Sequence, residues 1–386
     1  MSDVPHLRFP EFREEWEKCK VSDLLDFYST NSLSWEQLEY DTNAMMNLHY
    51  GLIHVGLPTM VDLAKDKLPN IKEDNIPKNF ELCKEGDVAF ADASEDTNEV
   101  AKTIEFYNLA EKNVVCGLHT IHGRDNKHKT VVGFKGYAFS STAFHNQIRR
   151  IAQGTKIYSI STKNFSECYI GLPSKPEQTK IATLLRLIDE RIATQNKIIE
   201  KLESLIKGLR HKLFESIIGD VTTLSEIANI YQPQTISSIE LTESGYNVYG
   251  ANGIIWKYHS YNHENEQVCI TCRGNTCGTV NYTSPKSWIT GNAMVISSDE
   301  YSSIIDKRYL YHYLCSMNFS SIISGSGQPQ IVRSPLEKLR IVLPTMRVQQ
   351  KVALCLDSIL CKTRTEEAIV MYLGEQRQHL LRQMFI

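Results

Sequence analysis

The chain has 386 residues, 42% of them hydrophobic and 23% charged, which is typical of a soluble globular protein with two or three domains. Its formal net charge of −3 excludes a uniformly basic nucleic-acid binder, but not a basic patch on one face. The first residues lack the basic and apolar regions of a signal peptide, and no apolar run approaches the roughly 18 residues of a membrane span. We therefore expect a cytoplasmic protein.

Residues 1–172 predict a first globular domain. Short β-prone runs such as Val114-Val115 and Val131-Val132-Gly133-Phe134 are separated by turn signals such as Glu85-Gly86-Asp87. This pattern predicts a mixed, β-rich α+β domain, although strand order does not follow from the sequence.

Residues 173–219 predict a long helix. Its apolar residues recur at alternating steps of four and three, a sustained heptad seam with one polar break at Gln195. Pro176 and Glu177 suit the first turn of a helix, and Gly219-Asp220 suits its end.

Residues 220–343 predict a second domain of the same class, with β-prone runs at Val268-Cys269-Ile270 and Ala293-Met294-Val295-Ile296 and a turn at Asn252-Gly253. Among ten cysteines, the closest group is Cys269, Cys272 and Cys277. Half a zinc site or a redox pair is one interpretation. No second CxxC and no suitably spaced histidine pair completes a tetrahedral site, so we predict strand and loop thiols and no metal.

Residues 344–386 predict a second long helix, with a poorer seam. Its apolar stripe is interrupted by Thr363, Glu366 and Arg377. A single amphipathic stripe must be covered, and the two helices can cover one another. We therefore predict an antiparallel coiled coil with internal pseudo-two-fold symmetry. The residues of its seam are Leu185, Ile188, Ile192, Ile199, Leu202, Ile206, Leu209, Leu356, Ile359, Val370, Leu373 and Leu380.

An internal repeat supports this layout. The segment Leu172–Ala182 and the segment Leu343–Ala353 share Leu, Pro, Gln, Lys and Ala at an offset of 171 residues. A weaker repeat relates residues 21–28 to residues 224–231 at an offset of 203. Some 35 helical residues extend roughly 50 Å, so the two domains would lie more than one turn of duplex DNA apart. An ordinary helical hairpin inside one compact fold is the alternative.

The sequence contains none of several catalytic motifs. There is no GxxxxGK(S/T) phosphate loop, no Asn/Asp-Pro-Pro-aromatic tetrapeptide, no GxGxxG after a strand and no HExxH. We predict that the chain is not an enzyme and has no catalytic residue.

The chain resembles the specificity (HsdS) subunits of Type I restriction-modification systems. The resemblance rests on the opening segment 5–12 with Trp16-Glu17, and above all on the doubled Leu-Pro-x-x-x-x-Gln-x-Lys-Ile/Val-Ala motif, each copy opening a helix. Further similar motifs lie at residues 49–54, 86–92, 117–121, 249–254 and 325–330.

The resemblance implies two target recognition domains, each of which reads one half of a bipartite DNA site. The helices would set the spacing between the half-sites and dock two modification subunits, and restriction subunits would join them. S-adenosylmethionine, ATP and Mg²⁺ would belong to those partners, and this chain would hold no cofactor.

Base edges are read mainly by Arg, Lys, Asn and Gln, and phosphates are bound by Lys, Arg and backbone N–H groups. Runs rich in these residues predict the DNA contacts. In the first domain they are His122, Arg124, Asn126, Lys127, Lys129, Asn146, Gln147, Arg149, Arg150 and Lys156. In the second domain they are Arg273, Asn275, Thr276, Ser326, Gln328, Gln330 and Arg333.

Two other classes of protein remain open at this point. One is a coiled-coil scaffold that never touches DNA, and the other is a nuclease that acts alone. Salt-dependent DNA binding would argue against the first, and an absence of cleavage with Mg²⁺ would argue against the second.

Overall fold

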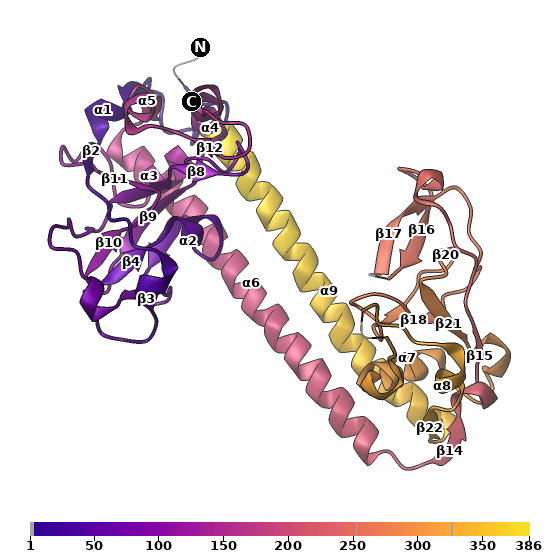
Figure 1. The fold of residues 1–386 in the computed structure, drawn as a ribbon. Coiled ribbons are helices and arrows are strands. Elements are labelled where there is room, and N and C mark those ends of the chain that lie inside the picture. Colours follow the sequence, from indigo (N-terminus) through magenta and orange to yellow (C-terminus); the bar gives the residue numbers. More distant parts are fainter. Residues whose placement is uncertain (1–3, 252, 326) are drawn as a thin grey trace. The chain divides into compact units, whose positions relative to one another are not determined.

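A computed structural model describes residues 4–251, 253–325 and 327–386 and divides into two compact units (Figure 1). Unit 1 comprises Met1–Gln195 and Ile369–Ile386, and unit 2 comprises Asn196–Ala368. The two long helices, α6 (Lys175–Ser216) and α9 (Met346–Gln383), lie within the predicted helical segments 173–219 and 344–386. Each long helix contributes to both units, so a unit is a globule together with parts of both helices.

Unit 1 is built on mixed sheets, as the sequence predicts. Its five-stranded sheet has the order β2-β11-β7-β9-β5, in which only the β5–β9 pair is parallel. Its strands are β2 (Asp26–Tyr28), β11 (Thr120–Arg124), β7 (Val88–Ala91), β9 (Thr103–Asn108) and β5 (Met60–Asp62). A four-stranded sheet consists of β10 (Val114–Cys116), β4 (Met46–Leu48), β6 (Asn70–Ile71) and β3 (Leu38–Glu39). Two pairs complete the strands, β1 (Glu17–Lys20) with β13 (Tyr169–Leu172) and β8 (Ala93–Ser94) with β12 (Tyr158–Ser159).

Short helices cover the sheets of unit 1. They are α1 (Val21–Leu24), η1 (Trp35–Gln37), α2 (Tyr50–His54), η2 (Glu73–Asn75), α3 (Phe134–Phe139), α4 (Thr142–Ile151) and α5 (Thr162–Ser166).

The expectation of a strand at residues 131–134 is wrong, because this segment is a turn that leads into α3. Gly133 has φ +93°, and its N–H and that of Gly136 donate to the buried carboxylate of Glu105, at 2.9 and 2.8 Å. The carboxylate of Glu105, an acceptor distant in sequence, therefore favours the start of α3 at this point.

Unit 2 repeats this plan with fewer strands. Its four-stranded sheet has the order β15-β21-β18-β19, and a three-stranded sheet has the order β17-β16-β20. The strands are β15 (Asn229–Tyr231), β21 (Ala293–Ser297), β18 (Val268–Thr271), β19 (Val280–Tyr282), β17 (Gly253–Tyr258), β16 (Tyr246–Gly250) and β20 (Trp288–Ile289), with β14 (Asp220–Thr223) paired to β22 (Arg340–Leu343). The helices are α7 (Lys307–Ser316), α8 (Arg333–Glu337), η3 (Leu224–Glu226), η4 (Ser238–Glu240), η5 (Asp299–Tyr301) and η6 (Ser320–Ile322).

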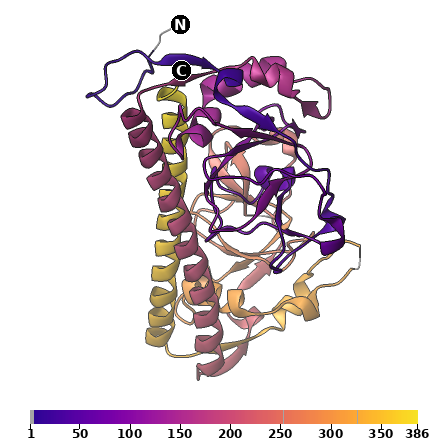
Figure 2. The ribbon, with the colours of Figure 1, turned by 90° about the vertical axis from the view of Figure 1, so that its left-hand side faces the viewer.

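Within each unit, apolar side chains of both long helices join the core of the globule. In unit 1 the shared core includes Leu185, Ile188, Ile192, Leu373 and Leu380, and Figure 2 shows the last turns of α9 beside the first turns of α6. In unit 2 it includes Ile206, Leu209, Leu356 and Ile359. The remaining predicted seam residues, Ile199, Leu202 and Val370, are half-buried. The helices run antiparallel within each unit, and regular coiled-coil packing stays a prediction.

The glutamine of the doubled motif has the same role in both units. In unit 1 the Gln178 amide donates to the carbonyl groups of Pro173 and Lys129 and accepts the N–H of Val131. In unit 2 the Gln349 amide donates to Pro344 and Ile304 and accepts the N–H of Asp306. Both side chains are 1% exposed. The repeat therefore preserves a buried amide that ties the start of each long helix to its globule.

A polar group also joins three helices in each unit. In unit 1, Asp189 of α6 accepts hydrogen bonds from Tyr137 of α3, at 2.9 Å, and Arg377 of α9, at 2.5 Å. In unit 2, His312 of α7 bonds to Asp357 of α9, at 3.0 Å, and to Arg210 of α6, at 3.1 Å. Arg377, a polar interruption of the predicted seam, thus has a structural partner.

Among the described residues, no helix is both long enough and apolar enough to cross a bilayer.

Candidate nucleic-acid interface

Two exposed loops of unit 2 lie side by side. The Arg273 loop (residues 272–279) connects β18 to β19, and the Gln330 loop (residues 324–330) precedes α8. Arg273 pairs with Gln330 in an isolated antiparallel bridge. The N–H of Gly274 donates to Pro329 O at 3.0 Å, and the N–H of Ile331 donates to Cys272 O at 3.0 Å. The backbone thus brings together two groups of residues that the sequence separates by about fifty positions.

Ala251, which follows β16, contacts the Arg273 loop. The hydroxyl groups of Thr271 and Thr276 donate to Ala251 O at 2.6 and 3.1 Å. Gly274 and Gly278 adopt positive φ values of +85° and +94°, which only glycine adopts without strain, so the loop can fold back tightly. Three chain segments therefore form one surface in unit 2.

The predicted DNA contacts of unit 2 lie on or beside this surface. Arg273, Asn275, Gln328, Gln330 and Arg333 are exposed, and Thr276 is half-buried. Arg333 opens α8 and pairs with Glu337 at 2.7 Å. Ser326 lies outside the described residues. The exposed group offers guanidinium and amide donors together with amide acceptors, which are the groups that recognise base edges.

Unit 1 contains the same loop arrangement. Gln153 and Ser159 form a bridge at the positions, 171 residues earlier, of the bridge between Ser324 and Gln330. Both loops turn at a glycine with positive φ, Gly154 and Gly325, where a Cβ would collide with the carbonyl oxygen three residues later. Ser159 pairs with Ala93 as Gln330 pairs with Arg273. The structural repeat therefore extends to the candidate recognition loops.

The predicted group at residues 146–156 lies on α4 and on this loop. Asn146, Arg149, Arg150 and Lys156 are exposed, and the two arginines occupy the last turn of α4. Gln147 has another use, because its amide donates to Tyr169 O and accepts the N–H of Tyr169, at 2.8 and 2.9 Å. Three cations beside the loop suit contact with phosphate.

The predicted run from His122 to Lys129 needs correction. His122 and Arg124 lie inside the domain, with 0% and 6% exposure, because both bond to the buried carboxylate of Asp87. They cannot reach a base in this structure. Asn126, Lys127 and Lys129 are at least partly exposed, but their side chains bond to Asp26, to the Asp23 carbonyl and to Glu17, respectively. Strand β11 also places this run at the opposite end from β8 and β12, since Thr120 pairs with Ala91 and Gly123 with Val88.

Segment 92–102, which the sequence patterns did not indicate, is the unit 1 counterpart of the Arg273 loop. The N–H of Ile160 donates to Asp92 O at 2.9 Å, as Ile331 donates to Cys272 O. Its sequence carries Glu95, Asp96 and Asn98 in place of arginine, and carboxylates can accept from cytosine N4. The buried strand Val88–Ala91 before it was the available signal, because the buried strand Val268–Thr271 precedes the Arg273 loop.

The closest cysteine group of unit 2 lies on β18 and in the loop that follows it. Cys269 and Cys272 lie in different apolar clusters, and burial raises the pKa of Cys269 to about 12. Burial also raises the pKa of Cys272 and of Cys277. Thiols that hold their protons in apolar surroundings agree with the interpretation as strand and loop cysteines.

Comparison with known proteins places this fold in a family. Residues 66–204 and 220–370 match the family model of the Type I restriction modification DNA specificity domain. These matches cover more than half of the chain, one in each half, and the chain belongs to this family.

Curated relatives are specificity subunits of type I restriction enzymes. A putative subunit of Haemophilus influenzae, S.HindORF215P, is 27% identical over 39% of this chain and 40% of its own length. The EcoprrI specificity subunit of Escherichia coli is 29% identical over 37% and 36%. The putative MjaX specificity subunit of Methanocaldococcus jannaschii is 23% identical over 90% and 88%. The chain thus spans less than half the length of the first two.

Two solved structures share the fold. The S subunit of a type I restriction-modification system from M. genitalium superposes with a TM-score of 0.64, at 18% identity over 99% of both chains. A chain from a study of complex assembly and conformational transition of the type I R-M system gives 0.56, at 16% identity over 98% of both. The expected fold class, two mixed β-rich recognition domains each followed by a long helix, is confirmed.

Proposed function

We propose that this chain is the DNA-binding specificity subunit of a Type I restriction-modification complex. Each unit reads one half of a bipartite site with its two bridged loops. The observation that carries the proposal is the duplicated loop pair, built on Gly154 in unit 1 and Gly325 in unit 2. Two copies of one exposed, polar surface in one chain suit two half-sites better than one continuous site.

The electrostatics of the loops support this function. The average charge of the chain is slightly negative, but Arg149, Arg150 and Lys156 gather beside one loop pair, and Arg273 lies at the other, where Arg333 is paired with Glu337. A local cluster of cations is sufficient for phosphate contact. The exposed amides of Gln328 and Gln330 add groups that distinguish bases.

Partners supply the chemistry in this proposal. Two modification subunits dock on the helices and bind S-adenosylmethionine, and restriction subunits bring ATP and Mg²⁺. The chain itself is a non-catalytic subunit. A scaffold that never touches DNA is not favoured, since the curated relatives are specificity subunits of restriction enzymes.

The substitution Arg273→Ala tests the assignment of the unit 2 surface. Arg273 is exposed at the bridge between two loops, and we expect its loss to weaken discrimination at one half-site by about 1–3 kcal/mol. The full chain with its modification subunits is titrated with duplexes that carry single-base changes in either half-site.

Lys338→Ala is the matched control, because Lys338 is an exposed cation of the same unit that follows α8, away from the bridge. It should leave both half-sites unchanged. Equal weakening of both half-sites by Arg273→Ala would contradict two independent readers.

A further inference from the structure

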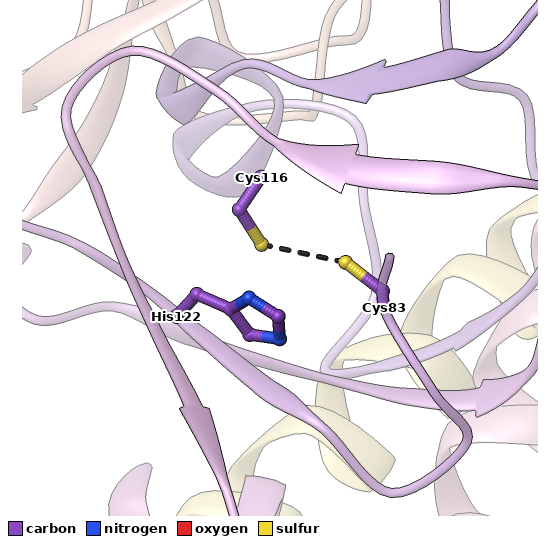
Figure 3. Close-up of side chains that lie close together, drawn as sticks. All are labelled: Cys83, Cys116 and His122. Atoms are coloured by element: carbon purple, nitrogen blue, oxygen red, sulfur yellow. Dashed lines mark hydrogen bonds between the residues drawn. The ribbon is translucent and has the colours of Figure 1, made fainter. Parts of the chain in front are cut away.

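A second group of chemically active side chains lies inside unit 1, away from the loops. The sulfur atoms of Cys83 and Cys116 are 3.6 Å apart. A ring nitrogen of His122 lies near both, and the three possible ligand atoms are all within 4.8 Å of one another. Figure 3 shows the three side chains pointing toward a common space. Their exposures are 5%, 2% and 0%, so the group is enclosed.

His122 is oriented as a metal ligand. Its Nε2 lies 2.7 Å from the carboxylate of Asp87, whose other partners include Arg124. A carboxylate at Nε2 favours the tautomer that carries the proton there, which leaves a lone pair on Nδ1. Nδ1 is fully buried and has no hydrogen-bond partner among the described residues. A polar atom buried without a partner is costly, and a metal ion would remove that cost.

The distances fit a metal ion better than a disulfide. Zinc–sulfur bonds of about 2.3 Å at a tetrahedral angle place two ligand sulfurs about 3.8 Å apart, close to the observed 3.6 Å. A disulfide requires about 2.05 Å, so the two sulfurs would have to approach considerably.

Charge favours a divalent ion. Two thiolates and a neutral imidazole around Zn²⁺ have a net charge of zero, which an enclosed site tolerates. Asp87 has its own counter-charge, since Arg124 bonds to both of its oxygens at 2.8 Å. Thiolate and imidazole ligands select zinc over magnesium or calcium.

We propose that Cys83, Cys116 and His122 bind one zinc ion, with Asp87 orienting the histidine. Cys116 ends β10 of the four-stranded sheet, and Cys83 lies beside β10, since its N–H donates to Val114 O at 2.8 Å, whereas His122 belongs to β11 of the five-stranded sheet. The ion therefore links the two sheets of the first recognition domain. A small ligand such as water completes the tetrahedron, because no fourth histidine, cysteine or carboxylate of the described chain belongs to the group.

Metal content and cobalt spectra of the full chain test this site. We expect about one zinc ion per chain by mass spectrometry after dialysis. Cys83→Ser and Cys116→Ser should lose most of it. The matched control is Cys168→Ser, a buried thiol of the same unit outside the group, which should keep its zinc. Cobalt added to the metal-free wild-type chain should give thiolate-to-metal charge-transfer absorption.

The cobalt measurement on the wild-type chain keeps the test decisive if a serine variant does not fold. A wild-type chain without zinc and without charge-transfer absorption after cobalt addition would overturn the proposal. So would zinc retained in both serine variants, or a Cys83–Cys116 disulfide found by peptide mapping of protein purified without reductant. These readouts do not depend on DNA binding, so the metal site and the proposed function can fail separately.

Discussion

At the scale of single residues, His312 shows how a buried side chain ties a recognition domain to both long helices. Arg210 can only donate, so the Nδ1 atom that it contacts at 3.1 Å must accept, and Nε2 must carry the proton toward Asp357. Burial and the charge of Arg210 lower the pKa of His312, although its bond to Asp357 acts in the opposite direction. The folded protein therefore holds this histidine neutral.

This histidine predicts a pH dependence of stability. Because its pKa is lower in the folded state, the unfolded chain takes up the proton more readily as the pH falls below about 6.5. The stability contributed by the neutral form is present above that pH and is lost below it. We expect the urea midpoint of unit 2 to fall between pH 7.5 and pH 5.5, and to fall less in His312→Gln.

Other histidines act in the same direction, since burial also lowers the pKa of His49, His145 and His263. The variant should therefore reduce the pH dependence without removing it. Hydrogen exchange within α7 assigns the effect to unit 2. An unchanged slope in His312→Gln would show that His312 does not titrate between the two states.

The sequence predicted least well which polar residues of the candidate site are buried. His122 and Arg124 lie in a run rich in DNA-binding residue types, yet Asp87, some 35 positions earlier, binds both inside the domain. Composition cannot show such a pairing because it depends on the register between β7 and β11. Arg273 and Gln330 do lie exposed in loops, since glycine-flanked polar segments seldom enter a core, and their contact with DNA stays a prediction.

At the scale of elements, the doubled helix-start motif has a physical explanation. Pro173 and Pro344 precede the two long helices, and the glutamine five residues later bonds to each proline carbonyl, at 2.9 and 3.0 Å. The same amide reaches into the globule. The motif was therefore visible in the sequence because both units need the same junction between helix and domain.

The substitution Gln349→Ala tests this junction. It leaves the N–H of Asp306 and the carbonyl groups of Ile304 and Pro344 without their partner in a buried site. We expect unit 2 to lose about 2–4 kcal/mol of unfolding free energy. Hydrogen-exchange mass spectrometry should show faster exchange at Asp306. The neighbouring exposed Gln350→Ala should change neither, and slow exchange at Asp306 in Gln349→Ala would refute the role.

Elements that depend on distant partners were less predictable than the repeat. The apolar run Val131–Phe134 has β-prone composition, but the carboxylate of Glu105 accepts the N–H groups of Gly133 and Gly136, and α3 begins there. Strand order and the bridged loops also required the structure, because unequal insertions hide the correspondence between segment 92–102 and the Arg273 loop. The long helices were predictable because their signal is periodic over many turns.

At the scale of the whole molecule, the chain is a duplicated unit of recognition domain and helix. The same amide junction, the same glycine-based loop and a comparable three-helix polar group occur in both units. Under the proposed function, these equivalent surfaces serve two identical partners and two stretches of DNA.

In the proposed function this chain reads two separate DNA elements. Selection from a randomised duplex library, with the full chain bound to the modification subunits of its host, tests this directly. We expect two short conserved elements separated by a gap of fixed length and unconserved sequence, with Arg273→Ala relaxing only one element. A single continuous element, or no enrichment above non-specific binding, would contradict it.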